Sequence, residues 1–298
     1  MAHDHHHIDP ASGDRKVAAA IAVNLGLTGA QIVAGLASGS LAMIADAIHN
    51  LSDALSLLIA FAARKISRRP SDAKMTFGYG RAEVVAALVN YTTLAVISLW
   101  LVWEGIVRLF EPQPIAGWIV VIVAGIALAV DLVTAALTYS MSKTSVNIRA
   151  AFIHNLADAL GSVGVIVAGT LILLFEWYIV DAIVTLGIAG YILWHVWKGT
   201  PRVIGMLMLG APPDVDANEV LHGMESVEDV ASVHHLHLWE VQEGTPAVDA
   251  HVVVNSADLA TVRTRLIAYL HDTFGVEHTT LEMERPGACP PDPIRIGH

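Results

Sequence analysis

A histidine and an aspartate four residues apart occur twice in the chain, each time within the same octet. The first copy is IHNLSDAL at residues 48–55, and the second is IHNLADAL at residues 153–160. On a helix, residues four apart lie one above the other on a single face. Two imidazoles and two carboxylates brought to one point form a tetrahedral ligand set that suits zinc. The pattern therefore predicts one metal site made of His49, Asp53, His154 and Asp158.

The octets belong to a chain that is far more apolar than an average soluble domain. Hydrophobic residues make up 54% of it and charged residues 15%, with a mean hydropathy of +0.57. Six runs approach the roughly twenty apolar residues that cross a bilayer. They cover about residues 17–36, 41–63, 82–103, 117–139, 149–175 and 178–197. We therefore expect an α-helical polytopic membrane protein, with six transmembrane helices in residues 16–205 and the octets in the second and fifth.

Basic residues predict the orientation of these helices, because cytoplasmic loops are enriched in lysine and arginine. If the N-terminus is inside, the outer loops of the membrane part hold Arg108 as their one basic residue. Both termini are then cytoplasmic, and the second and fifth helices run in opposite directions. Inverted repeats that meet at a binding site are a recurring plan in transporters. Glu83 and Asp181 fall near span ends and are expected at the membrane interface.

Further polar residues accompany the octets, and ionisable groups at membrane depth tend to mark a pathway or a bound ion. Asp46 lies on the same stripe as the first octet, whereas its counterpart before the second is Ala151. The sequence leaves open whether Asp46 is a fifth ligand, a proton relay or a paired structural acid. Asn50 and Asn155 are expected to orient the ligands. Asp131 is interpreted as a pathway residue, with helix pairing as the alternative.

The C-terminal region, residues 206–285, reads as a separate soluble domain. Helical patterns cover 214–227 and 258–274, and strand patterns cover 232–241, 247–254 and 276–284. This order predicts an α+β ferredoxin-like (αββαβ) cytoplasmic domain. Residues 212–298 hold 15 of the 28 acidic residues but only 4 of the 17 basic ones. Such a balance favours cations as partners and disfavours nucleic acid.

The two ends of the chain are expected to lack a fixed fold. Residues 1–15 form a His-rich cytoplasmic tail that could either collect a cation loosely or remain a solvated tail. Residues 286–298 are rich in proline and predict a disordered tail. The single cysteine, Cys289, excludes an intramolecular disulfide and a cysteine-rich zinc site.

Charge suggests how the membrane site would work. Two close carboxylates repel each other when no metal is present, which favours protonation of at least one of them, and imidazoles titrate near neutral pH. A divalent cation requires deprotonated ligands. Metal and protons therefore compete, and a site exposed alternately to each side of the membrane would exchange one for the other.

With these features the chain resembles the cation diffusion facilitator family, and specifically its zinc-exporting bacterial members. The resemblance is carried by six spans, the doubled His/Asp octet, the Phe77–Arg81 loop (FGYGR) and the αββαβ tail. It implies a homodimeric zinc/proton antiporter of the bacterial inner membrane that binds the lipid bilayer, divalent metal and protons. The His49 of the second span favours zinc, with cadmium as a further candidate.

The resemblance also implies metal sites outside the membrane. Its dinuclear cytoplasmic site maps onto His234, His251, Glu282 and Glu284, with His237 and His278 close by, and would hold zinc ions. Strand alternation adds a condition, because regular strands would place His234 on the opposite face from His251. A solvated polar face is the alternative interpretation. Some family members hold another metal between the second and third spans, but Asp72, Met75 and Tyr79 at the matching positions predict no such site here.

Two other functions compete with transport. A His/Asp zinc site could activate water in an intramembrane metalloenzyme. The sequence has no His-Glu-x-x-His motif, and the four ligands leave no open position on the metal. The third function is a membrane metal sensor whose tail domain carries the activity.

Overall fold

The computed structural model describes residues 25–67, 69–142, 146–288 and 293–297 of the 298-residue chain. The His-rich tract of residues 1–15 lies outside this part. The chain forms two compact units. One contains the residues up to Ala60 together with Val89–Lys198, and the other contains Phe61–Leu88 and the residues from Gly199 onward.

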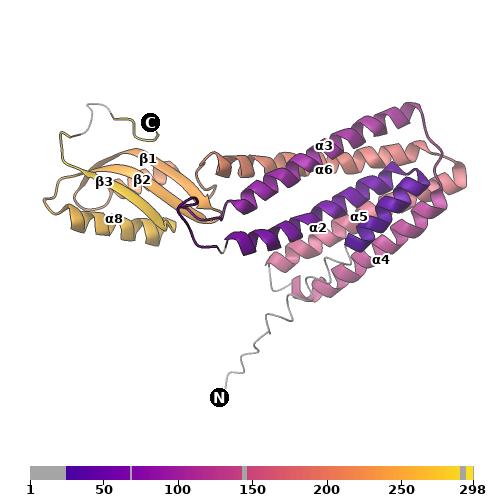
Figure 1. Cartoon of the computed structure of the whole chain (residues 1–298), viewed down its shortest axis with the longest axis horizontal. Coiled ribbons are helices and arrows are strands. Elements are labelled where there is room, and N and C mark those ends of the chain that lie inside the picture. The colour runs from indigo at the N-terminus through magenta and orange to yellow at the C-terminus, as the bar shows by residue number, and fades with distance from the viewer. Residues whose placement is uncertain (1–24, 68, 143–145, 289–292, 298) are drawn as a thin grey trace, which may run out of the picture. The chain divides into compact units, whose positions relative to one another are not determined.

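Helices occur at all six places where the sequence predicts spans. The helix Leu25–Ser38 is followed by α2 (Leu41–Ser67), α3 (Ala82–Phe110), α4 (Gly117–Ser142), α5 (Val146–Phe175) and α6 (Ile179–Leu207), and Figure 1 shows the long helices bundled together. Within the described residues, four segments are long and apolar enough to cross a membrane: Ala82–Phe110, Gly117–Ala136, Asp158–Phe175 and Ile179–Leu207. A helical membrane domain is thus confirmed.

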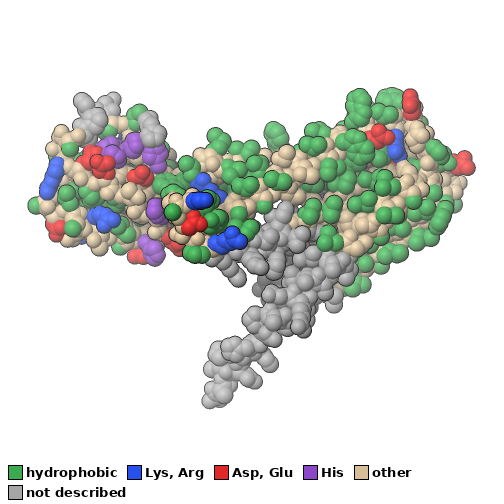
Figure 2. All heavy atoms as spheres, viewed as in Figure 1, with side chains coloured by type: hydrophobic (Ala, Val, Ile, Leu, Met, Phe, Trp, Pro, Cys, Tyr) green, Lys and Arg blue, Asp and Glu red, His purple; other side chains and the backbone are tan. Residues whose placement is uncertain are grey.

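The outer surface of these helices is hydrophobic, as Figure 2 shows over much of the helical part. Trp103 and Trp197 are 69% and 80% exposed, and Leu36 is 70% exposed. Side chains of this kind would form a large apolar patch in water. Their exposure is explained by contact with lipid, where helices satisfy every backbone polar group internally.

Inside the bundle, small residues let helices approach closely. A Cβ atom added at Gly169 of α5 would lie 2.9 Å from Val120 Cγ1 of α4, and one at Gly117 would lie 2.7 Å from the Gly169 carbonyl oxygen. Around this contact Val120, Ala124 and Val165 form a buried cluster. Small residues at helix contacts are typical of membrane bundles, where tight packing replaces the hydrophobic effect.

The start of α2 is fixed by residues from two helices. Ser40 Oγ accepts a hydrogen bond from the Met43 amide (3.2 Å), which makes Ser40 the N-cap. Asp181 of α6 accepts the Leu41 amide (2.8 Å), lies 3.3 Å from the Ala42 amide, and accepts the Ser40 hydroxyl (2.5 Å). Asp181, which is expected at the membrane interface, lies in the first turn of α6, and its buried side chain anchors the helix that carries the first octet.

Two helix boundaries differ from the apolar runs. Helix α5 begins at Val146, before Arg149, so its octet lies well inside the helix. Helix α6 continues through Pro201 to Leu207, about ten residues beyond the apolar run. A proline removes one backbone donor and one intrahelical hydrogen bond. Helix α6 nevertheless continues for six residues past Pro201.

The C-terminal unit confirms the αββαβ order. It contains α7 (Ala217–Glu225), β1 (Val230–Gln242), β2 (Thr245–Val254), α8 (Leu259–Phe274) and β3 (His278–Glu284). The sheet order is β1-β2-β3, with β1 and β2 antiparallel and β2 and β3 parallel. The helices and the sheet enclose a core that includes Leu221, Val248, Val252 and Leu266.

The edge of β1 has a further partner. The sequence predicts disorder for residues 286–298, whereas residues 294–297 lie along β1 in the structure. The His235 amide donates to the Ile294 carbonyl (2.9 Å), the Leu236 amide to the Arg295 carbonyl (3.0 Å), and the Gly297 amide to the Leu236 carbonyl (3.1 Å). The Arg295 guanidinium also pairs with Glu225 of α7. These contacts cover part of an edge that would otherwise be open to pairing.

Candidate functional site

Both octets are helical, the first within α2 and the second within α5. His49 Nε2 lies 3.1 Å from Asp158 Oδ1, and the two side chains are 17% and 10% exposed. A histidine of one copy thus contacts an aspartate of the other. The ring of His49 also packs edge-on against Tyr191 of α6, with centroids 5.6 Å apart. The side chains of Asp53, His154 and Asn155 lie outside the described part of the structure.

A second polar group lies beside this pair on α2. Asp46 is 2% exposed and accepts a hydrogen bond from Gln31 Nε2 (2.8 Å), and Asn50 Nδ2 donates to Gln31 Oε1 (3.1 Å). Gln31 was missed by the sequence reasoning. Its signal was an amide in an apolar run, where a polar side chain needs a buried partner.

Asp131 of α4 is connected to α5. Ser162 Oγ donates to Asp131 Oδ2 (3.3 Å), and Ser162 lies one turn after Asp158. This contact is a link between two helices, which was the alternative interpretation of Asp131. Its place one turn from the octet leaves the pathway interpretation open.

In the αββαβ unit, three predicted ligands converge. His251 Nδ1 lies 2.7 Å from Glu284 Oε1, and His234 Nε2 lies 3.5 Å from Glu284 Oε2. One ligand atom from each of these residues lies within 4.8 Å of the others. His251 Nε2 is also 3.3 Å from Glu282 Oε2. The arrangement follows the strands, since His234 is opposite His251 on β2, and His251 is opposite Glu282 on β3.

A bulge in β1 explains how His234 joins His251. The pairing shifts between His234 and His237, and His235 has a φ of +53°. A β-bulge inserts an extra residue and breaks the regular alternation of faces. The condition of regular strands therefore does not hold, and His234 is 4% exposed beside His251, with ring centroids 5.3 Å apart.

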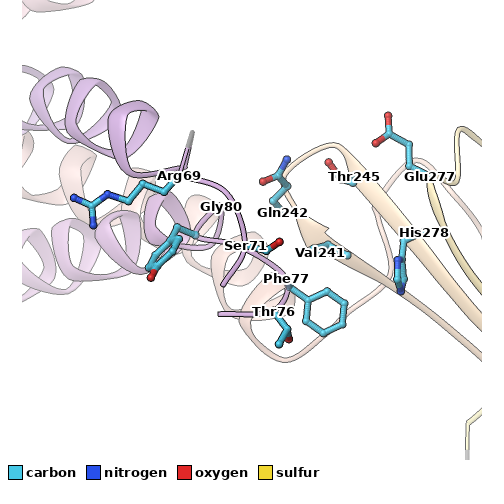
Figure 3. Close-up of a pocket in the computed structure, with 12 residues that line it drawn as sticks. Arg69, Ser71, Thr76, Phe77, Gly80, Val241, Gln242, Thr245, Glu277 and His278 are labelled. Atoms are coloured by element: carbon cyan, nitrogen blue, oxygen red, sulfur yellow. The ribbon is translucent and has the colours of Figure 1, made fainter. Parts of the chain in front are cut away.

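The other two histidines are not among the three residues whose ligand atoms converge. His237 contacts His235, with ring centroids 4.9 Å apart, and both line a cavity of about 270 Å³ with Asp249. His278 begins β3 and packs edge-on against Phe77, with centroids 5.7 Å apart. Figure 3 shows it in a cavity of about 630 Å³ that is also lined by Val241 and Gln242. The structure thus does not bring His278 to the cluster of His234, His251 and Glu284.

The cluster has the properties expected of a zinc ligand set. It offers two imidazoles and a carboxylate, the donors that zinc prefers. Among the described residues, His234 Nδ1 and Glu284 Oε2 are buried without a hydrogen-bond partner. Buried polar atoms of this kind are rare unless an ion or water completes them. The residues present therefore fit a bound cation.

The loop between α2 and α3 has a different chemistry. Asp72 accepts hydrogen bonds from the Tyr79 hydroxyl (2.6 Å) and from the Met75 and Lys74 amides (2.9 and 2.7 Å), which lower its pKa. The same carboxylate raises the pKa of Tyr79. The Asp72 side chain thus organises a turn.

Known proteins resemble the chain over nearly its whole length. The family models for the cation efflux transmembrane domain and the cation efflux protein cytoplasmic domain match residues 17–199 and 212–286. Zinc transporter ZitB of Pectobacterium atrosepticum is 36% identical over 95% of this chain and 89% of its own length. A cadmium, cobalt and zinc/H(+)-K(+) antiporter of Bacillus velezensis is 33% identical over 95% of this chain and 92% of its own.

Among solved structures, the metal-bound C-terminal domain of the CzcD transporter from Cupriavidus metallidurans is 32% identical. The match covers 24% of this chain and 99% of the solved domain, with a TM-score of 0.22. The first family model falls on the long helices and the second on the αββαβ segment. The chain belongs to the cation efflux family.

Proposed function

We propose that the protein exports divalent metal, chiefly zinc, from the cytoplasm in exchange for protons. The metal binds at a site of His49, Asp53, His154 and Asp158 that opens alternately to each side of the membrane. The observation that carries the proposal is the 3.1 Å contact between His49 Nε2 and Asp158 Oδ1, which joins the two octets. The names of the relatives, a zinc transporter and a cadmium, cobalt and zinc/H(+)-K(+) antiporter, support it.

The chemistry of the pair explains coupling to protons. A histidine nitrogen and a carboxylate oxygen bind protons as well as metal. A divalent cation can take both atoms as ligands only when neither of them carries a proton. Each cycle therefore exchanges metal for protons, and an inward proton gradient drives metal outward. Cadmium shares the affinity of zinc for imidazole and is a further substrate.

The cytoplasmic cluster is proposed as a resident zinc site. His234, His251 and Glu284 would hold the ion, and Glu282 lies close enough to contribute. Bound zinc would fasten β1, β2 and β3 at one edge. The family of the cytoplasmic domain supports a homodimer, and the basic residues support a bacterial inner-membrane protein with both termini in the cytoplasm.

Metal uptake into everted membrane vesicles tests the transport proposal. Zinc should enter when the vesicle interior is acidified, and the uptake should collapse with an ionophore that removes the pH gradient. Asp158→Ala should abolish uptake. Glu111→Ala, which removes an exposed carboxylate from an outer loop, is the matched control and should transport normally. If wild-type vesicles accumulate no zinc, transport is excluded and the sensor or the enzyme takes its place.

A further inference from the structure

Gln31 uses both ends of its side-chain amide to bind α2. Each end forms a hydrogen bond with a different polar residue of that helix. The Gln31 side chain is 0% exposed, on the helix Leu25–Ser38. Its Nε2 donates to Asp46 Oδ2 (2.8 Å), and its Oε1 accepts from Asn50 Nδ2 (3.1 Å). Burying an amide without partners would cost several kcal/mol, so this satisfied geometry is strongly preferred.

The two residues that Gln31 holds flank a transport ligand. Asp46 and Asn50 are four apart and therefore lie one turn apart on one face of α2. His49 is on the same stripe, three residues after Asp46 and next to Asn50. The hydrogen bonds from Gln31 to Asp46 and Asn50 restrict rotation of α2 about its axis. Such a rotation would move His49 away from Asp158.

The network also reaches α5. A Cβ atom placed on Gly161 would lie 3.1 Å from Asp46 Oδ1, so the backbone of α5 approaches the carboxylate at a residue without a side chain. Among the described residues, His49, Asp131 and Asp158 are titratable side chains that act electrostatically on Asp46. Asp46 thus lies between the first helix and α5, within the field of the transport site.

We propose that Gln31 is a positioning residue for the transport site. It does not touch the metal, but it holds Asp46 and Asn50 so that His49 faces Asp158. This inference rests on the proposed function. It also assigns a role to Asp46 that the second octet lacks, because Ala151 at the equivalent position offers no group for another helix to hold.

The test is a comparison of zinc transport kinetics in reconstituted full-length protein. Gln31→Leu removes both hydrogen bonds with little change in volume. The apparent KM for zinc should rise about tenfold or more, the loss expected when hydrogen bonds to a charged group are removed. Vmax should change much less, and the thermal midpoint should stay close to wild type. Gln31→Asn keeps the amide on a shorter side chain and should raise KM by a smaller factor.

A mutant cycle separates positioning from a general packing defect. If Gln31 acts through Asp46, Gln31→Leu should add little to the KM of Asp46→Leu, because the single change has already broken the contact. Thr185→Val is the matched control, since Thr185 is also 0% exposed but donates its hydroxyl within its own helix. Its KM should be that of wild type.

An unchanged KM in folded Gln31→Leu, or additive effects in the cycle, would overturn the inference. If Gln31→Leu does not fold, Gln31→Asn replaces it in both measurements with the same criteria. Failure of the proposed function is distinct, because wild-type protein would then carry no zinc flux. Active wild type with unaffected Gln31 variants refutes only the role of Gln31.

Discussion

Replacing Asp181 tests how the helix of the first octet is anchored. The carboxylate of Asp181 serves the Leu41 and Ala42 amides and the Ser40 hydroxyl, all at the start of α2. These are the donors that a helix cannot satisfy within itself. Asp181→Ala would leave them buried without an acceptor. Asp181→Asn would keep one acceptor oxygen and lose the charge.

The expected loss follows from those contacts. A hydrogen bond to a charged group contributes about 1.5–3 kcal/mol, and a carboxylate at a helix N-terminus adds about 0.3–1 kcal/mol. The contacts share one side chain and are not additive, and a buried donor left without an acceptor costs about 1–3 kcal/mol. We therefore expect Asp181→Ala to cost about 3–5 kcal/mol. At about 2–4 °C per kcal/mol, the unfolding midpoint falls by about 6–20 °C. Asp181→Asn should cause about half of this shift.

Thermal unfolding of the detergent-solubilised protein, followed by tryptophan fluorescence, measures the effect. Glu104→Ala is the control, because Glu104 is a partly exposed acid that pairs with Arg108 (3.1 Å) in the i,i+4 manner. Such a pair contributes only about 0.3–0.5 kcal/mol. If Asp181→Ala shifts the midpoint no further than Glu104→Ala, the capping argument is refuted. The same follows if Asn is as harmful as Ala.

Three further outcomes concern the second unit. Glu284→Gln should weaken zinc binding about 10–100-fold, measured by titration calorimetry in an Asp158→Ala background, whereas unchanged affinity would exclude the cluster. Deleting residues 286–298 should speed hydrogen exchange at the Leu236 amide, and unchanged exchange would mean that the tail does not cover β1. Asp72→Ala should increase tryptic cleavage after Lys74. The pKa of Asp72 is lowered, so the wild-type turn is stable above the ordinary carboxyl pKa. The turn is lost as the pH falls through the lowered pKa, and reduced protection of the Lys74 amide from hydrogen exchange would report that loss.

The repeated octet makes the contact between His49 and Asp158 predictable, but not the residues that support it. Spacing alone places His49 and Asp53 on one face, and the orientation from basic residues makes the two copies antiparallel. The structure confirms helices at both copies and brings His49 to Asp158. Gln31 was not predictable in the same way, because the partner of a lone polar residue depends on which helix packs beside it. Helix packing is a tertiary property that no periodicity within one helix contains.

In the αββαβ unit, the sequence does not predict the sheet face on which His234 lies, because one extra residue in β1 changes that face. Element order and approximate bounds follow from alternation and helical periodicity, and they are confirmed. Which face a histidine occupies depends on register, and a single bulge reverses it. The bulge at His235 does this, so a rule based on regular strands would have excluded His234. Composition was also a poor guide to residues 294–297, since their order depends on hydrogen bonds to the edge of β1.

The two halves of the membrane domain have the same octet, and the described contacts show how the first copy is supported. In α2, Asp46 and Asn50 are held by Gln31, and the helix start is held by Asp181. The second octet has alanine at the position of Asp46, and α5 meets that carboxylate with Gly161. The described contacts on α2 thus hold it by side-chain hydrogen bonds to the helix Leu25–Ser38 and to α6. Helix α5 meets Asp46 through Gly161, which has no side chain to form such a bond.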